Sequence, residues 1–291
     1  MSTGTAGSSL LSAISNSWYT AKRYLERNGN RLLSIETLLL YAFLYLPIIV
    51  VIVTSFNDAR IAIAWRGFTT RWYEAILTGQ STRVVNPDVA WVAFKNSMYI
   101  GIVSMVVATV FGTMLAFVLQ RHDFVGKTPF TGLVYMPIIM PSIIMGISVL
   151  LFFRIVGLAT GVETTMIAHI AFNISYVAVI VYARLASFDE ILEEAGKTLG
   201  ANRLETFRYI TLPNIMPAII AAALLAFVLS FDDFVITFFV IGTENTLPVY
   251  FFGMVRQGIA PGVNVIATLI VVGASIVIFG AWYVAGEDVF V

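Results

Sequence analysis

Six long apolar segments alternate with polar ones along the chain. They cover about residues 35–56, 94–119, 130–153, 165–186, 217–241 and 263–285. A membrane-spanning helix needs about 20 mostly apolar residues, and in lipid only helices or closed barrels satisfy every backbone polar group. These segments are too long and too uniformly apolar for barrel strands. The pattern therefore predicts an all-α polytopic membrane protein with six transmembrane helices.

The composition supports a membrane protein and argues against several other functions. Of the 291 residues, 59% are hydrophobic and 12% are charged, whereas soluble domains carry about 25% charged residues. The net charge is zero and no basic tract occurs, so nucleic acid is not a predicted partner. The chain has no Cys and only two His. Disulfides and thiolate metal sites are excluded, and neither a metal centre nor a cofactor is predicted.

Two GKT triplets invite comparison with a phosphate-binding loop. They lie at 126–128 and 196–198. Such a loop needs a glycine five residues before the glycine of the triplet, after a strand. Arg121 and Ile191 occupy those positions. With no HExxH or GxSxG pattern either, the chain is not predicted to be an enzyme.

Lys and Arg residues in the short loops predict the orientation, because they favour the cytoplasmic side. The residues assigned to that side are Lys22, Arg23, Arg27, Arg31, Arg121, Lys127, Arg184, Lys197, Arg203 and Arg208. The opposite side offers Arg154 and Arg256, together with a loop at 57–93 whose four arginines weaken the trend without reversing it. Both termini, and a polar segment at about 189–217, are therefore predicted to be cytoplasmic.

The N-terminal part of the chain differs from the rest. Residues 1–30 are polar and are predicted to form a cytoplasmic arm ahead of a transmembrane domain at 31–291. Residues 8–27 mix apolar and basic side chains, which fits either a helix on the membrane surface or a disordered tail. The first apolar segment is long enough to span, so no cleavable signal peptide is predicted.

The polar segment at about 189–217 separates two apolar runs and is predicted to be a helical hairpin. Ser187–Glu190 fits a capping box that opens its first helix, and Gly200 suits a left-handed C-cap. The first helix carries a short apolar stripe of Leu192, Ala195 and Leu199. These signals predict one short amphipathic helix that ends in a glycine turn.

The second arm of the hairpin carries its own signals. Asn202 followed by Glu205 resembles another capping box. Pro213 is expected to stop this helix, and Pro217 to lie in the first turn of the next span. Its apolar stripe is Leu204, Phe207 and Tyr209 or Ile210. Two capped helices with apolar faces are compatible with a solvated connector or with a protein interface.

At these residues the sequence resembles the permease subunits of bacterial ABC importers. The matching pattern is EAA-x3-G-x9-I-x-LP, carried here by Glu194, Ala195, Gly196, Gly200, Ile210, Leu212 and Pro213. Gly196 departs from the pattern but keeps a small residue. The resemblance implies a type I importer permease (MetI-like) fold. It also implies that the hairpin is a coupling element that fits a groove on a cytoplasmic ATPase.

The resemblance covers nearly the whole chain after residue 30 and is nearest to the polyamine (spermidine/putrescine) branch, in its PotC-like subunit. The similar stretches are Ser55–Asn57, Gly67–Tyr73, Ser230–Phe234 and Pro261–Thr268. The resemblance implies an inner-membrane protein in contact with lipid, with four kinds of partner. These are a homologous permease, a dimer of cytoplasmic ATPases, a periplasmic or lipid-anchored binding protein and a polyamine substrate.

Two adjacent acids, Asp232 and Asp233, lie within the fifth predicted span. An ionised carboxylate at the centre of a membrane helix costs about 2.5–3.5 kcal/mol on insertion scales, so each needs a partner or a wet cavity. Adjacent helical residues point about 100° apart. One acid is therefore expected to face a path for a cationic substrate while the other meets a neighbouring helix or subunit. An intersubunit salt bridge or a packing hydrogen bond is the alternative.

The fourth and third spans hold further candidates. His169, Asn173 and Tyr176 share one helix face, which predicts either interhelical hydrogen bonds or a polar lining of the substrate path. Pro137 and Pro141 predict either a packing kink or broken backbone at a cavity. Tyr135 and Trp91 could hold an ammonium group by cation–π contact, but no spacing places them near the acids.

The sequence thus predicts the permease subunit of an ATP-driven polyamine importer. One alternative keeps the importer and changes the cargo to ferric iron, thiamine, sulfate or another small solute. A secondary transporter or channel is a further alternative, disfavoured by the hairpin motif and by the lack of inverted repeats. A membrane enzyme has no nucleophile or metal constellation to support it.

Overall fold

The computed structural model describes residues 29, 31, 33–59, 64–82, 86–258 and 260–285. The predicted N-terminal arm lies almost wholly outside these ranges, and its role stays a prediction. The first helix is Leu33–Thr54. The later elements are α2 (Arg71–Thr78), α3 (Pro87–Arg121), α4 (Lys127–Ile139), α5 (Ser142–Ile155), α6 (Val162–Ala186), α7 (Ile191–Thr198), α8 (Arg203–Thr206), the π-helical turn η1 (Phe207–Thr211), α9 (Leu212–Asp232), α10 (Val235–Val240), α11 (Leu247–Arg256) and α12 (Ala260–Ala285). The predicted all-α class is confirmed.

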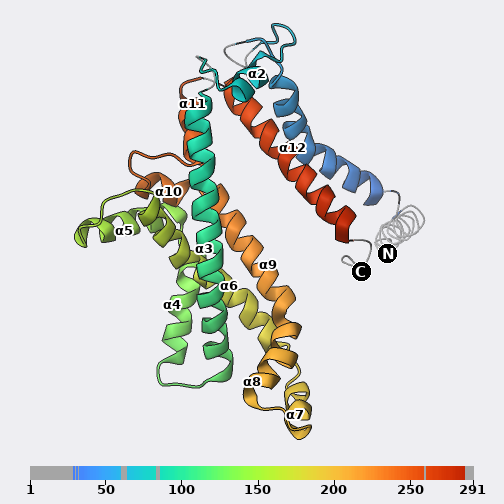
Figure 1. Cartoon of the computed structure of the whole chain (residues 1–291), viewed down its shortest axis with the longest axis vertical. Coiled ribbons are helices and arrows are strands. Elements are labelled where there is room, and N and C mark those ends of the chain that lie inside the picture. The colour runs from blue at the N-terminus through green and yellow to red at the C-terminus, as the bar shows by residue number, and fades with distance from the viewer. Residues whose placement is uncertain are drawn as a thin grey trace, which may run out of the picture. The chain divides into compact units, whose positions relative to one another are not determined.

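The chain divides into two compact units (Figure 1). One contains the described parts of Met1–Thr69 and Asn264–Val291. In it, the Asn264 side chain donates a hydrogen bond to Thr54 Oγ1 at 2.9 Å. The loop after the first helix turns around Asn57, which is 1% exposed. Its amide donates to the Ala64 carbonyl and accepts from the Arg66 N–H, both at 2.9 Å.

The other unit, Thr70–Val263, is built on a bundle of α3, α6 and α9. Small residues let the first two of these helices approach closely, as is common in membrane bundles. On α3 they are Ala108, Gly112 and Ala116, all buried and four residues apart. A Cβ added at Gly112 would fall 2.6 Å from the Val177 Cβ on α6. The contact therefore leaves no room for a side chain at this position.

The count of six spans is not confirmed among the described residues. Four helices are long and apolar enough to cross a membrane: Leu33–Thr54, Pro87–Arg121, Val162–Ala186 and Arg203–Asp232. A fifth span results if the bent pair α4 and α5 is taken as one. In α12, the stretch Pro261–Ile276 is a shorter apolar helix.

The third predicted span is broken rather than kinked. Helices α4 and α5 meet at an angle of 110°. Pro137 is accommodated inside α4, whereas Met140 and Pro141 are both extended, with ψ 136° and ψ 130°. Proline disfavours the helical conformation of the residue before it, so the chain turns at Met140. The backbone is therefore broken and not merely kinked, and a cavity beside the break stays a prediction.

The fifth predicted span also breaks. Helix α9 ends at Asp232, Asp233 is extended with φ −65° and ψ 121°, and α10 begins at Val235. The expectation of one helix to residue 241 is wrong, and so is the 100° helical angle between the two acids. The Asp233 carboxylate accepts the Thr237 N–H at 2.8 Å. This cap stabilises a new helix start at a place without glycine or proline.

The second arm of the hairpin does not stop at Pro213. The chain is helical from Arg203 to Asp232 without interruption. In η1 the helix widens, and the Leu212 N–H donates to the Phe207 carbonyl five residues earlier. The wide turn lets Pro213, which lacks an N–H, enter the first turn of α9. Pro217 consequently lies inside α9 and not at its start.

Candidate functional site

The hairpin begins at Asp189, not at Ser187. The Asp189 side chain accepts the Ile191 N–H at 3.0 Å. Ser187 instead follows the last turn of α6, where its hydroxyl donates to the Arg184 carbonyl. The predicted capping box is wrong because α6 extends to Ala186, one residue before it.

The turn of the hairpin has the predicted geometry. Gly200 has φ 93°, the left-handed conformation that suits glycine. The Asn202 side chain accepts the N–H groups of Leu204 and Glu205, both at 3.0 Å. Glu205 in return accepts the Asn202 N–H at 2.8 Å. This second capping box was predictable because its partners lie within three residues.

Gly196 lies where the two arms of the hairpin touch. It is buried, and an added Cβ would overlap Ile210 Cδ1 on η1. The two motif positions Gly196 and Ile210 therefore contact each other directly. The other motif residues lie nearer solvent: Glu194, Ala195, Gly200 and Pro213 are exposed and Leu212 is half-buried.

Several large apolar side chains of the hairpin are exposed. Leu199 is 90% exposed, Leu204 73% and Tyr209 70%. Ile191 and Leu192 on α7 are exposed as well. Large apolar side chains gathered on a short polar segment are typical of a protein-binding surface. We call this set, Ile191, Leu192, Leu199, Leu204 and Tyr209, the hairpin surface.

A charged cluster that the sequence did not reveal ties the hairpin to α3. Arg121, the last residue of α3, donates to Glu193 at 2.8 Å and to Glu190 at 3.1 Å. Glu193 is largely buried, and the same carboxylate oxygen accepts the Thr211 hydroxyl at 2.6 Å. We call Arg121, Glu193 and Thr211 the hairpin clamp. Sequence reasoning missed it because 72 residues separate Arg121 from Glu193.

The two adjacent acids have different surroundings. The Asp232 side chain is exposed at the end of α9, and among the described residues no hydrogen bond or ion pair reaches it. The Asp233 side chain is 13% exposed. It accepts the Thr237 N–H and hydroxyl at 2.8 and 2.9 Å, and lies 3.4 Å from His169 Nε2 on α6.

The polar face of α6 is turned into the bundle. Asn173 is fully buried, and its amide donates to Ser230 Oγ at 2.7 Å and to the Ala226 carbonyl at 3.3 Å. Tyr176 is half-buried, with its ring edge-on to Phe172 at 6.2 Å. Interhelical hydrogen bonding, one of the two alternatives, is therefore what Asn173 does. The structure brings Asn173 together with α9 at Ala226 and Ser230, six and two residues before Asp232.

Aromatic side chains connect Trp91 to the chain segment of the acids. Trp91 is exposed and stacks on Phe94 at 5.5 Å. Phe94 meets Phe231, the residue before Asp232, edge-on at 6.4 Å. The Trp91 ring already holds an ammonium group, because Lys95 Nζ lies 5.2 Å from its centroid. Sequence reasoning could not place Trp91 near the acids, because this neighbourhood depends on how α3 packs on α9.

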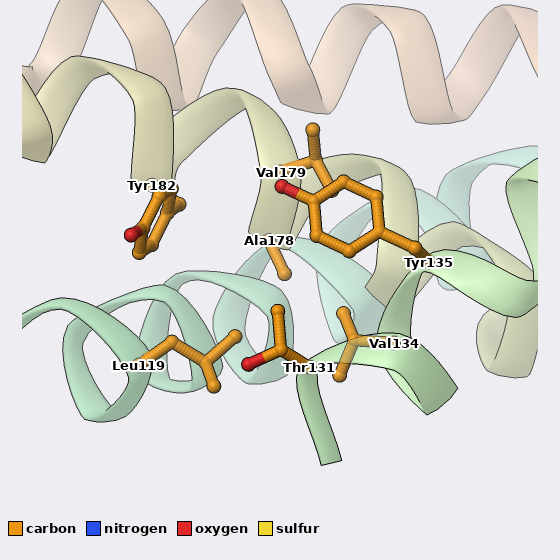
Figure 2. Close-up of a pocket in the computed structure, with 7 residues that line it drawn as sticks. All are labelled: Leu119, Thr131, Val134, Tyr135, Ala178, Val179 and Tyr182. Carbon is orange, nitrogen blue, oxygen red and sulfur yellow. The ribbon is translucent and has the colours of Figure 1, made fainter. Parts of the chain in front are cut away.

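Tyr135 lies elsewhere, in a narrow crevice between α3, α4 and α6. Figure 2 shows Tyr135 and Tyr182 at two ends of it, with apolar side chains between them. The full lining is Leu119, Thr131, Val134, Tyr135, Ala178, Val179 and Tyr182. No acid lines this crevice, so it does not suit a cation. The described part of the chain also contains no group of three or more His, Cys, Asp or Glu that could hold a metal ion.

Comparison with known proteins identifies the class. Residues 108–286 match the family described as "Binding-protein-dependent transport system inner membrane component". The chain belongs to this family, whose members are transport subunits of the inner membrane and not enzymes. The predicted importer permease class is thereby confirmed.

Individual relatives place the chain more narrowly. It is 37% identical over 249 residues to the "Spermidine/putrescine transport system permease protein PotC" of Escherichia coli K12, covering 85% of this chain and 91% of the relative. It is 40% identical over 254 residues to the "Putrescine transport system permease protein PotI" of the same strain, covering 84% and 88%. A bacterial ABC transporter that imports alginate has a chain of the same fold. The two chains have a TM-score of 0.62 and 18% identity, over 90% of this chain and 98% of that one.

Proposed function

We propose that this chain is the permease subunit of an ATP-driven importer that carries spermidine or putrescine across the inner membrane. The relatives named above support the cargo. The observation that carries the proposal is the exposed carboxylate of Asp232 within the membrane-spanning part of the chain. An unpartnered carboxylate at this depth is costly unless a cation meets it, and it repels anions. Polyamines supply ammonium groups of the opposite charge.

The hairpin surface is the proposed docking site of the ATPase. Its exposed leucines and Tyr209 can fill an apolar groove, and the hairpin clamp fixes it to the bundle. The family description supports a separate substrate-binding protein. A homologous permease would supply the other wall of the path, and an ATPase dimer would bind one hairpin from each permease. The cytoplasmic position of the hairpin and of both termini is part of this proposal.

One helix connects the proposed docking site with the proposed substrate site. The helical segment Arg203–Asp232 has 30 residues, and at about 1.5 Å per residue it is about 45 Å long. Movement of the hairpin on ATPase closure would therefore reach Asp232 through continuous backbone. Rocking of this helix against α3 and α6 would expose the acid first to one side and then to the other.

The four residues expected along the path contribute differently to this proposal. Asp232 is exposed and suits direct contact with the substrate. Tyr176 and Asp233 are half-buried, and Asn173 is fully buried in hydrogen bonds. We assign Asn173 to holding α6 against α9, which keeps the wall of the path in place.

Uptake of labelled solutes in a strain that lacks this importer tests the cargo. The chain and its partner subunits are restored together, and uptake of spermidine, putrescine, ferric ion and thiamine is measured. The proposal expects polyamine uptake that disappears when the ATPase subunit is inactivated. Uptake of ferric ion or thiamine without polyamine would assign the other cargo.

A further inference from the structure

The break between α9 and α10 gives the two neighbouring acids different surroundings. Asp233 lies at the start of α10, where its Oδ2 accepts both the N–H and the hydroxyl of Thr237. The N-terminal end of a helix carries partial positive charge. The negative charge of Asp233 is therefore matched inside the protein by backbone and side-chain donors.

His169, on α6, contacts the Thr237 side chain. Its Nε2 lies 3.0 Å from Thr237 Oγ1. Because the Thr237 hydroxyl gives its single proton to Asp233, His169 Nε2 must carry the proton in the bond to Thr237. A chain of donors thus runs from His169 through Thr237 to Asp233. His169 is fully buried, and its ring is edge-on to Phe172 at 5.3 Å, which fixes its orientation.

Asp232 lies at a helix end whose partial charge has the opposite sign. It is the last residue of α9, a helix of 21 residues. The C-terminal end of a helix carries partial negative charge from its unpaired carbonyl groups. The exposed Asp232 carboxylate adds a full negative charge, with no basic partner among the described residues. In transporters, the C-terminal ends of interrupted helices are places where cations bind.

We propose that Asp232 alone contacts the ammonium groups of the substrate, while Asp233, His169 and Thr237 are positioning residues that hold the helix break in place. This inference rests on the proposed polyamine transport and assigns its substrate contact. The break ends α9 at Asp232 and so presents the carboxylate together with the last carbonyls of that helix. Without the Asp233 cap, α9 and α10 could join into one helix and turn Asp232 away.

The same substitution at the two adjacent positions tests the assignment. Asp232→Asn and Asp233→Asn each remove one charge and preserve shape. The whole complex is reconstituted in proteoliposomes, and KM and maximal rate are measured with spermidine as the probe. Asp232→Asn should raise KM by about tenfold or more, because a charge-assisted contact with the ammonium is lost. Asp233→Asn should raise KM several times less, since asparagine caps a helix nearly as well as aspartate.

Removal of the cap then tests the positioning role. Asp233→Ala and His169→Leu should raise KM as strongly as Asp232→Asn, whereas His169→Gln, which keeps an N–H donor, should restore most of the loss. Adding Asp233→Ala to Asp232→Asn should raise KM little further, because both changes affect one contact. A residue with a merely structural role would lower the maximal rate or the amount of complex and leave KM unaffected.

Each outcome has one interpretation. Equal KM for the two Asn variants, or a larger effect at Asp233, overturns the assignment while polyamine transport stands. A reduced yield of assembled complex for Asp232→Asn also overturns it, because Asp232 would then belong to an interface between subunits. A wild-type complex that transports no polyamine overturns the proposed function itself, and the substrate contact with it.

Discussion

Single residues set the shape of the hairpin. Gly196 lets α7 touch Ile210 on the second arm, and Gly200 turns the chain with φ 93°. Both positions belong to the sequence motif, and the structure gives each a physical reason. Gly200 and the capping box of Asn202 were predictable from sequence because their contacts are local. The contact between Gly196 and Ile210 was not, since it requires the two arms to fold together.

A valine at Gly196 should loosen the hairpin. Its Cβ would overlap the Ile210 side chain, and overpacking of this kind costs about 1–3 kcal/mol. We expect less ATPase subunit to remain on the purified complex. Gly132→Val is the matched control, because Gly132 is also helical and an added Cβ there meets nothing within 4 Å. Equal retention of ATPase by both variants would contradict the account.

A valine at Gly200 should uncouple ATP hydrolysis from transport. The left-handed backbone disfavours a β-branched residue by about 1–2 kcal/mol, so the hairpin turn would open or shift. The measurement is the number of ATP molecules hydrolysed per polyamine transported, which should rise. Gly157→Val imposes similar strain at φ 76° outside the hairpin. This control should give a lower ratio of ATP hydrolysed to polyamine transported than Gly200→Val does. An unchanged ratio for Gly200→Val would count against the docking role.

Among whole elements, one of the two helix breaks can be predicted from the sequence and the other cannot. The break at Met140 follows from Pro141, although its 110° angle does not. The break after Asp232 has no proline or glycine, and it depends on donors from Thr237 and His169 that only the tertiary fold supplies. Pro213 failed as a stop signal because a π-helical turn absorbed it.

The hairpin clamp is the contact through which α7 should move α3. Arg121→Glu should place like charges together and leave the largely buried Glu193 without its cationic partner, a loss of about 1–3 kcal/mol. Transport should fall more than assembly. Combining Arg121→Glu with Glu193→Arg should restore part of the transport, since the pair is reversed and not removed. Failure of the double variant to exceed both single variants in transport would argue against the clamp.

For the molecule as a whole, the absence of cysteine allows a clean test of orientation. Single cysteines at Leu199 and Leu77 are both placed at strongly exposed positions, 90% and 81%. The proposed orientation puts Leu199 in the cytoplasm and Leu77 outside. In cells that lack the ATPase subunit, which would cover Leu199, a membrane-impermeant maleimide should therefore label Leu77→Cys when the cells are intact and Leu199→Cys only after the membrane is opened. Labelling of Leu199→Cys in intact cells would invert the orientation.

We propose that ATP hydrolysis on a partner moves a polyamine through this chain, by way of the helix from the hairpin to Asp232. The most direct measurement is spermidine uptake into proteoliposomes that contain the full complex, with ATP inside or outside and without an ion gradient. We expect uptake that requires ATP on the hairpin side and stops when the hairpin surface is disrupted by Leu199→Asp with Leu204→Asp. Uptake that an ion gradient drives in the absence of ATP would contradict it.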